Sequence, residues 1–187
     1  MAAFPATESD AQREYQVKAA TVLVLLMMST AAWSLPTVDG KISTGEYRRS
    51  ISVLDGSATL YYDVDGQGGL YLAVSAATTG WVGLGLGTGV MNGAHIFMGF
   101  VKDGVPVFSE QIGDGHGHRE SPDKSADSFA VGQEGGRTTI EFHVPADKLP
   151  VVGKTVSFIV AFSGSADLTT YHDDNHDGGT IDLSLPE

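Results

Sequence analysis

The chain has 187 residues, of which 42% are hydrophobic, and this length and composition suit one domain with a core of its own. Its formal net charge of −12 argues against nucleic acid or an anionic membrane surface as a partner, because both require a basic patch. The sequence contains no cysteine, which excludes disulfides, thiolate nucleophiles, Cys-ligated zinc, iron–sulfur clusters and haem attached through a C-x-x-C-H motif.

The N-terminal part of the chain has the features of an export signal. An apolar run at residues 19–28 follows Lys18 and is followed by small residues up to Ser34. The run is shorter than the about 20 apolar residues that a membrane span requires. We therefore predict an N-terminal extension and signal peptide over residues 1–34 and one exported domain over residues 35–187. The protein is then secreted or periplasmic, and an uncleaved N-terminal anchor is the alternative.

The rest of the chain consists of short segments in which apolar and polar residues alternate. Gly- and Asp-containing turns separate these segments, as is typical of antiparallel strands. We predict strands over residues 58–65, 70–76, 81–87, 96–102, 105–111, 137–144, 155–163 and 180–185, and a helical turn over 145–149. Such a series indicates an all-β fold, an antiparallel β-sandwich.

One strand stands out because glycine fills every second position. The alternation places Trp81, Gly83 and Gly85 on one face, and the apolar residues between them face the other way. Glycine inside a strand usually marks a place where something bulky approaches the backbone, such as a ring or a packed aromatic. A Gly-rich turn then leads to Met91. On these residues alone, a buried strand followed by a core methionine is the simpler interpretation.

The chain shows no catalytic or nucleotide-binding motif. It has no G-x-G-x-x-G register at the glycines, no Gly-Lys-Ser/Thr and no G-x-S-x-G, and an enzyme is therefore not expected. His116 and His118 form a pair without a third ligand. Residues 173–178 match the start of a calcium loop, but Ser184 stands where that loop needs a glutamate.

Three motifs, taken in order, resemble the DOMON domain family. They are Thr79-Gly80-Trp81-Val82-Gly83-Leu84-Gly85, Met91-Asn92-Gly93-Ala94 and Tyr171-His172. The best-understood members of this family are b-type cytochrome domains such as that of cellobiose dehydrogenase. The resemblance covers roughly residues 37–185 and implies an immunoglobulin-like β-sandwich.

The same resemblance implies a cofactor and its ligands. It suggests a non-covalent haem b whose iron has Met91 and His172 as axial ligands. The residues expected beside the porphyrin are Trp81, Gly83, Gly85, Phe97 and Tyr171. A Met/His pair suits electron transfer rather than oxygen activation. The expected function is therefore electron exchange with a redox partner protein outside the cytoplasm, with no catalysis by the chain itself.

Two positions depart from the family pattern, and one alternative function stays open. The family usually has an acidic residue where this chain has His95, which could be a surface substitution, a hydrogen-bond donor near the site, or a competing iron ligand. The pair at residues 116–118 has no family counterpart. The alternative is a haem-free β-sandwich that binds carbohydrate or another small molecule, for which Tyr61 and Tyr71 would form an aromatic platform.

Overall fold

The structure is a computed structural model that describes residues 34–184. The predicted signal peptide lies outside the described residues. The strands are β1 Arg49–Val53, β2 Ala58–Val64, β3 Leu70–Ala76, β4 Val82–Leu86, β5 His95–Lys102, β6 Val105–Asp114, β7 Gly117–Glu120, β8 Ser128–Glu134, β9 Arg137–Val144, β10 Thr155–Phe162 and β11 His176–Asp182. Two short 3-10 turns, Leu54–Gly56 and Ala146–Lys148, accompany them. In this part of the chain, no helix has the length and apolar character needed to cross a membrane.

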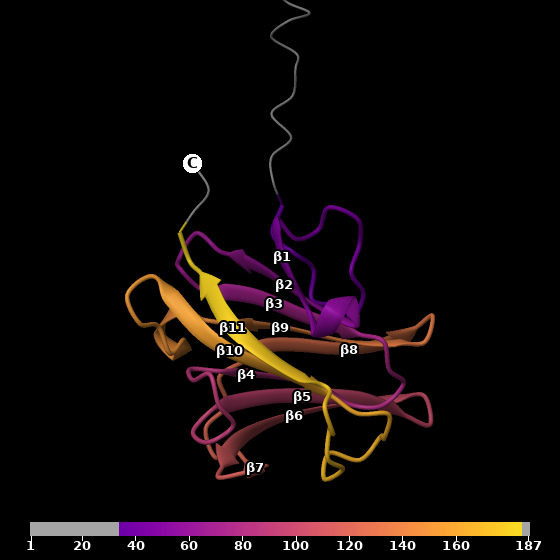
Figure 1. Cartoon of the computed structure of the whole chain (residues 1–187). Helices are drawn as coiled ribbons and strands as arrows, with labels where there is room; N and C mark the ends of the chain where they lie inside the picture. Colours follow the sequence, from indigo (N-terminus) through magenta and orange to yellow (C-terminus); the bar gives the residue numbers. More distant parts are fainter. Residues whose placement is uncertain (1–33, 185–187) are drawn as a thin grey trace, which may run out of the picture. The chain divides into compact units, whose positions relative to one another are not determined.

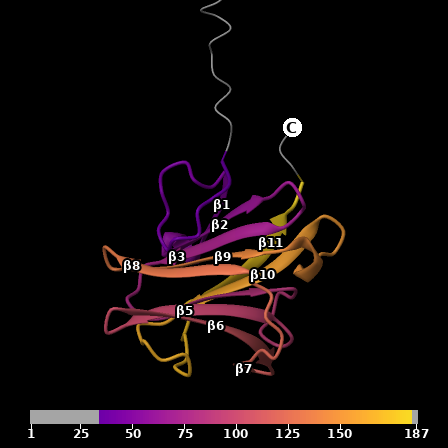
Figure 2. The ribbon, with the colours of Figure 1, turned by 180° about the vertical axis from the view of Figure 1, so that it is seen from behind.

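The strands form two antiparallel sheets. The five-stranded sheet has the order β1-β2-β3-β9-β8, and the six-stranded sheet has the order β11-β10-β4-β5-β6-β7. The two sheets lie in layers, with β10 and β11 passing in front of the other sheet in the first view and behind it in the second (Figures 1 and 2). The predicted antiparallel β-sandwich with an immunoglobulin-like architecture is confirmed.

The core lies between the two sheets and follows from the strict alternation within each strand. Leu60, Leu72 and Ile140 of the five-stranded sheet are fully buried and belong to one cluster with Leu84 and Phe158 of the six-stranded sheet. The apolar side chains of β4 therefore point into this core, while the residues between them, Gly83 and Gly85, face outward.

The predicted central strands agree with the structure to within a few residues, whereas edge strands were missed. The strands β1, β7 and β8 were not predicted, and β11 begins at His176 rather than at residue 180. All four lie at the edge of a sheet, where both backbone and side chains are half-exposed and the apolar pattern is weak. The strands β6 and β7 form a hairpin whose turn contains His116, and Gly115 adopts a φ of +61° in that turn.

The outer faces of the two sheets differ in character. The outer face of the six-stranded sheet carries a second apolar cluster that includes Trp81 and Met98. By contrast, the outer face of the five-stranded sheet carries buried polar residues, among them Asp63 and Glu141. The segment before β1 covers part of this polar face, because the backbone N–H groups of residues 39–41 donate hydrogen bonds to Glu141. Each outer face is a candidate binding surface.

Candidate functional site

The glycines of β4 face outward on the six-stranded sheet, as predicted. Gly83 pairs with Met98 and Gly85 with Ile96, and both partners belong to the outer apolar cluster. The buried members of this cluster are Trp81, Ala94, Ile96, Met98 and Phe100, and its partly buried members include Met91, Ile159, Ala161, Ala166 and Leu168. The sequence motif thus forms the floor of an apolar surface that is separate from the main core.

Protein side chains already approach both glycines closely. A Cβ atom on Gly85 would lie 2.7 Å from Cγ1 of Ile159 and 3.2 Å from Cβ of Ala94. A Cβ atom on Gly83 would lie 3.4 Å from Cγ of Met98 and 3.6 Å from the Trp81 ring. The glycines therefore serve the packing of the outer cluster, including an aromatic ring, whatever else this face binds.

The turn that carries Met91 is fastened to β6. The N–H of Gly93 donates to the carbonyl of Gly113 at 3.0 Å, and the N–H of Gly113 donates to the carbonyl of Ala94 at 2.9 Å. The N–H of Ala94 in turn donates to the carbonyl of Met91 at 3.1 Å. These bonds fix the backbone of the turn, so that the Met91 side chain packs, partly buried, against the outer cluster.

Gly113→Ala is expected to displace the Met91 turn. The added Cβ would lie 1.7 Å from the Met91 carbonyl oxygen, which is backbone and has to move. We expect a loss of about 1–3 kcal/mol in the free energy of unfolding, measured in urea, and a shift of the Met91 methyl signal in methyl-labelled protein.

The matched control for this substitution is Gly117→Ala in the neighbouring strand β7. Its added Cβ would make only an ordinary contact of 3.7 Å. The control should leave both the stability and the methyl signal nearly unchanged. An unmoved Met91 signal in Gly113→Ala would show that the turn is not held by this close approach.

The loop between β10 and β11 carries His172, and Trp81 fastens this loop to β4. The N–H of Trp81 donates to the carbonyl of Ser165 at 2.9 Å, and the Trp81 carbonyl accepts from the N–H of Ser163 at 3.0 Å. The indole Nε1–H of Trp81 donates to the carbonyl of Thr170 at 3.2 Å. His172 then meets the Trp81 ring edge-on, with 6.5 Å between ring centroids. The residue at the head of the glycine strand therefore positions the histidine loop.

A hydrogen bond sets the tautomer of His172. Its Nδ1 lies 2.8 Å from the backbone carbonyl of Asp173. A carbonyl only accepts hydrogen bonds, so that Nδ1 carries the proton and Nε2 keeps its lone pair in the neutral ring. This is the arrangement of an imidazole that binds a metal through Nε2. The neighbouring Tyr171 is 67% exposed, and its ring is tilted against that of His172 with 4.4 Å between ring centroids.

The predicted position of Phe97 beside the glycines is wrong. Phe97 pairs with Leu84, whose side chain faces the core, and is itself 1% exposed. Its ring stacks on Phe142 of the opposite sheet with 4.2 Å between centroids. Paired residues of neighbouring strands share a face, so that the register of β4 against β5 places Phe97 on the core side of the sheet. The residues of β5 that face the glycines are Ile96 and Met98.

His95 also faces away from Met91. It shares the inward face with Phe97, on whose ring it stacks at 5.0 Å, and its Nε2 lies 2.9 Å from Oε2 of Glu110. Glu110 is 4% exposed and also accepts hydrogen bonds from the backbone N–H groups of Ser125 and Ala126. His95 thus belongs to a buried polar contact inside the sandwich, and a role as competing iron ligand does not fit this placement.

The other two candidate metal sites are not assembled. Asp177 accepts hydrogen bonds from the backbone N–H groups of Leu54 and Gly178, and these bonds lower its carboxyl pKa. His118 faces Gln111, with 3.4 Å between Nδ1 and Oε1. Within residues 34–184, no group of three or more His, Asp or Glu side chains is placed to hold a metal ion. This finding does not argue against a haem site. A porphyrin supplies four of the iron ligands itself, and a methionine ligand such as Met91 is not among the residue types in such a group.

Comparison with known proteins agrees with this fold. A model of the DOMON domain matches residues 54–163, more than half of the 187 residues, and no curated protein matches the chain. The cytochrome b domain of pyranose dehydrogenase from Coprinopsis cinerea is similar with a TM-score of 0.54 and 17% identity, over 72% of this chain and 80% of that chain. The cytochrome domain of Myriococcum thermophilum cellobiose dehydrogenase is similar with a TM-score of 0.53 and 11% identity, over 73% of this chain and 81% of that chain. At these identities the structural likeness concerns the fold alone. The chain belongs to the DOMON domain family.

Proposed function

We propose that the domain binds a non-covalent haem b and transfers electrons, with Met91 and His172 as the axial ligands. The observation that carries this proposal is the hydrogen bond from His172 Nδ1 to the Asp173 carbonyl, which leaves Nε2 free to bind a metal. Met91 and the Trp81 ring that His172 contacts belong to the same outer apolar cluster. The two solved structures compared above are both cytochrome domains.

The chemistry of the residues fits such a group. A thioether and an imidazole are the protein ligands of high-potential haem iron, and a bound haem supplies one-electron transfer. The chain's own residues supply the rest. Ile96 and Met98 offer apolar contacts, while Trp81 holds the histidine loop in place and helps to exclude water. In this proposal Trp81 and Tyr171 contact the cofactor, which lies over the side chains packed on Gly83 and Gly85, and the chain carries no catalytic residue.

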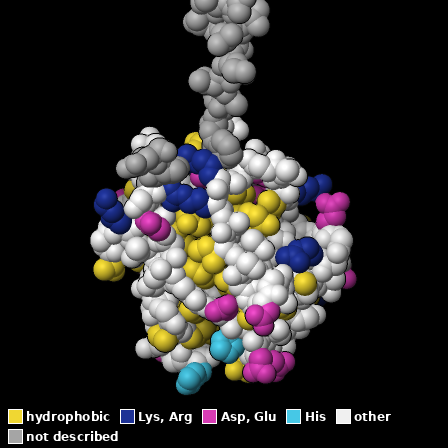
Figure 3. Space-filling view, turned by 45° about the horizontal axis from the view of Figure 1, so that its top comes forward, with side chains coloured by type: hydrophobic (Ala, Val, Ile, Leu, Met, Phe, Trp, Pro, Cys, Tyr) yellow, Lys and Arg dark blue, Asp and Glu magenta, His cyan; other side chains and the backbone are white. Residues whose placement is uncertain are grey.

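A redox protein outside the cytoplasm is the partner we propose. The predicted signal peptide and the division into residues 1–34 and 35–187 support this location. The segment that follows His172 is acidic, with Asp173 and Asp174 exposed in the loop and Asp177 exposed at the start of β11. Figure 3 shows acidic and histidine side chains gathered in the lower part of that view, away from most of the lysine and arginine side chains. A partner with a basic docking surface fits this distribution of charge.

An optical spectrum of the full chain, purified after haem supplementation and then reduced, tests the function. We expect the sharp α and β bands of low-spin b-type haem and about one haem per chain, since two strong axial ligands give a six-coordinate iron. A protein that stays colourless with added haemin would remove the proposal.

Met91→Ala is expected to change this spectrum and to lower the reduction potential, because it removes the thioether ligand. The matched control is Met98→Leu, which removes the other methionine of the same outer cluster at nearly constant volume. If the two variants behave alike in the spectrum and in a potentiometric titration, Met91 is not a ligand.

A further inference from the structure

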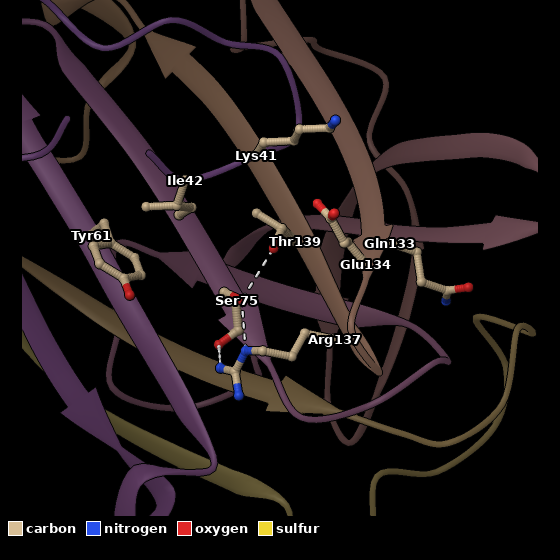
Figure 4. Close-up of a pocket in the computed structure, with 9 residues that line it drawn as sticks. Lys41, Ile42, Tyr61, Ser75, Gln133, Glu134, Arg137 and Thr139 are labelled. Atoms are coloured by element: carbon tan, nitrogen blue, oxygen red, sulfur yellow. Dashed lines mark hydrogen bonds between the residues drawn. The ribbon is translucent and has the colours of Figure 1, made fainter. Parts of the chain in front are cut away.

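A second candidate site lies on the outer face of the five-stranded sheet. A groove of about 580 Å³ opens there, and this volume is in the range of small-molecule sites. Tyr61 of β2, Ser75 of β3 and Arg137 of β9 contribute to its lining, and Ile42 comes from the segment before β1 (Figure 4). With Glu134 at the end of β8, the groove is built from five parts of the chain, on the sheet that does not carry Met91.

Arg137 is held in place at the floor of the groove. Its Nε donates to Oγ of Ser75 at 3.0 Å, and its Nη2 donates to the Ser75 carbonyl at 2.7 Å. Thr139 adds a bond from its hydroxyl to Oγ of Ser75 at 3.1 Å. Ser75 and Thr139 are each only 8% exposed. These bonds leave Nη1 of the guanidinium group without an acceptor among the described residues, and a planar guanidinium is suited to a carboxylate.

The groove is also locally basic on an acidic protein. Lys41 and Arg137 supply two positive charges against the single carboxylate of Glu134, whereas the whole chain has a net charge of −12. The backbone of Lys41 is anchored by its N–H to Glu141 at 3.1 Å, which keeps the residue at this rim. Positive charge concentrated in a concave surface favours an anionic ligand.

The two walls differ in the contacts that they offer. Figure 4 shows Tyr61 and Ile42 on one side and Glu134 and Gln133 on the other. Gln133 pairs with the fully buried Thr138, and its side chain is directed away from the groove, since its amide Nε2 donates to the Thr79 carbonyl at 2.7 Å and to the Thr138 hydroxyl at 3.2 Å. Glu134 pairs with Arg137 and shares its outward face, so that the Glu134 carboxylate presents the acceptors for hydroxyl groups. The half-buried Tyr61 ring on the other side can receive the C–H face of a saturated ring.

We propose that this groove binds a small hydroxylated carboxylate, of the class of sugar acids. Arg137 and Lys41 would take the carboxylate, Glu134 the hydroxyl groups, and Tyr61 the ring face. Tyr71, the other aromatic residue considered in the sequence, does not line this groove, and its ring packs at a tilt against His143 with 4.4 Å between centroids. The proposal is independent of haem binding, which concerns the other sheet.

Titration of the full chain, followed by the amide signals of residues 41, 61 and 139 in NMR, tests the site. The probes are D-glucuronate, D-glucose, which lacks the carboxylate, and acetate, which lacks the hydroxyl groups. We expect saturable binding of D-glucuronate that is at least about tenfold tighter than that of either comparison compound, since each lacks one set of charge-assisted or hydroxyl bonds. Equal binding of D-glucose or of acetate, or no saturable binding of D-glucuronate, would overturn the proposal.

Variants then assign the residues. Arg137→Gln is expected to weaken D-glucuronate binding about tenfold, the effect of one charge-assisted contact. Because Arg137 also holds Ser75, Lys41→Gln serves as a second variant at the exposed rim, and we expect it to weaken binding about threefold. Arg119→Gln removes an exposed arginine of β7, outside the groove, and is the matched control. Unchanged affinity in both Arg137→Gln and Lys41→Gln would contradict the assignment.

Discussion

Glu141→Ala is expected to lower the free energy of unfolding by about 3–5 kcal/mol. The side chain is fully buried, and its Oε2 accepts hydrogen bonds from the backbone N–H groups of Asp39 at 3.1 Å, Gly40 at 2.7 Å and Lys41 at 3.1 Å. Its Oε1 accepts from the Tyr47 hydroxyl at 3.0 Å. Alanine would leave the N–H groups of Asp39 and Gly40 and the Tyr47 hydroxyl without their acceptor, whereas the Lys41 N–H keeps its bond to Oδ1 of Asp39 at 2.9 Å. We expect the segment before β1 to detach from the sheet, which urea unfolding would measure.

The matched control is Glu134→Ala, which removes an exposed glutamate of the adjacent strand β8 and should change stability by no more than about 0.5 kcal/mol. A similarly small effect of Glu141→Ala would show that the carboxylate does not hold the segment.

The contribution of Glu141 to stability is also expected to depend on pH. Burial raises the pKa of Glu141 above its ordinary value of 4.5, against the effect of the hydrogen bonds that it accepts.

The sign of that pH dependence follows from linkage. A raised carboxyl pKa in the folded state means that the stabilising contribution is fully present below pH 4.5 and is lost as the pH rises through the raised value. The difference in stability between the wild type and Glu141→Gln, whose side chain does not ionise, is therefore expected to narrow over that range. A difference that widens with rising pH would mean that the carboxyl pKa is lowered instead.

His172→Ala is expected to weaken haem binding at least about 100-fold, because removal of groups that only support a metal ligand already costs 10–100-fold. The control is His176→Ala, since His176 is exposed and its ring lies 4.8 Å from that of His172. It removes a neighbouring imidazole of the same segment and should leave haem affinity within about threefold of the wild type.

Two measurements separate a ligand from a structural residue in this comparison. Haem titration gives the affinity, and urea unfolding of the haem-free protein gives the stability. His172 is only partly buried, so that its removal is expected to change the stability of the haem-free protein by about 0.5 kcal/mol or less. Comparable haem binding by the two histidine variants would exclude His172 as the ligand and leave the fold assignment unaffected.

Sequence patterns predicted the central strands because each of them is buried on a face that alternates strictly. The glycine face of β4 could be predicted for the same reason. Which residues lie beside it could not, since that depends on the register between β4 and β5, and Phe97 and His95 consequently lie on the inward face. The alternation of side chains along residues 95–100 shows that Phe97 and His95 share a face. Only the pairing of Phe97 with Leu84 shows that this face points into the core.

The Glu141 contacts had no signal in the sequence. The carboxylate and its backbone donors are separated by 100 to 102 residues, and the donors lie in a segment without regular secondary structure. The only local feature that bears on this contact is Gly40, whose φ is +86° and whose added Cβ would lie 2.8 Å from the backbone nitrogen of Gly132. Such a close approach of two glycines is visible only once the segment is folded over the sheet.

One outer face of the sandwich is apolar and the other is polar, and the core separates them. Packed sheets lie about 10 Å apart, and the side chains that fill the space between them belong to one continuous core. A ligand above Tyr61 and Arg137 and a ligand above Gly83 and Gly85 would therefore share no contact residue. If both proposals hold, a substitution at one outer face is therefore expected to leave ligand binding at the other face unchanged.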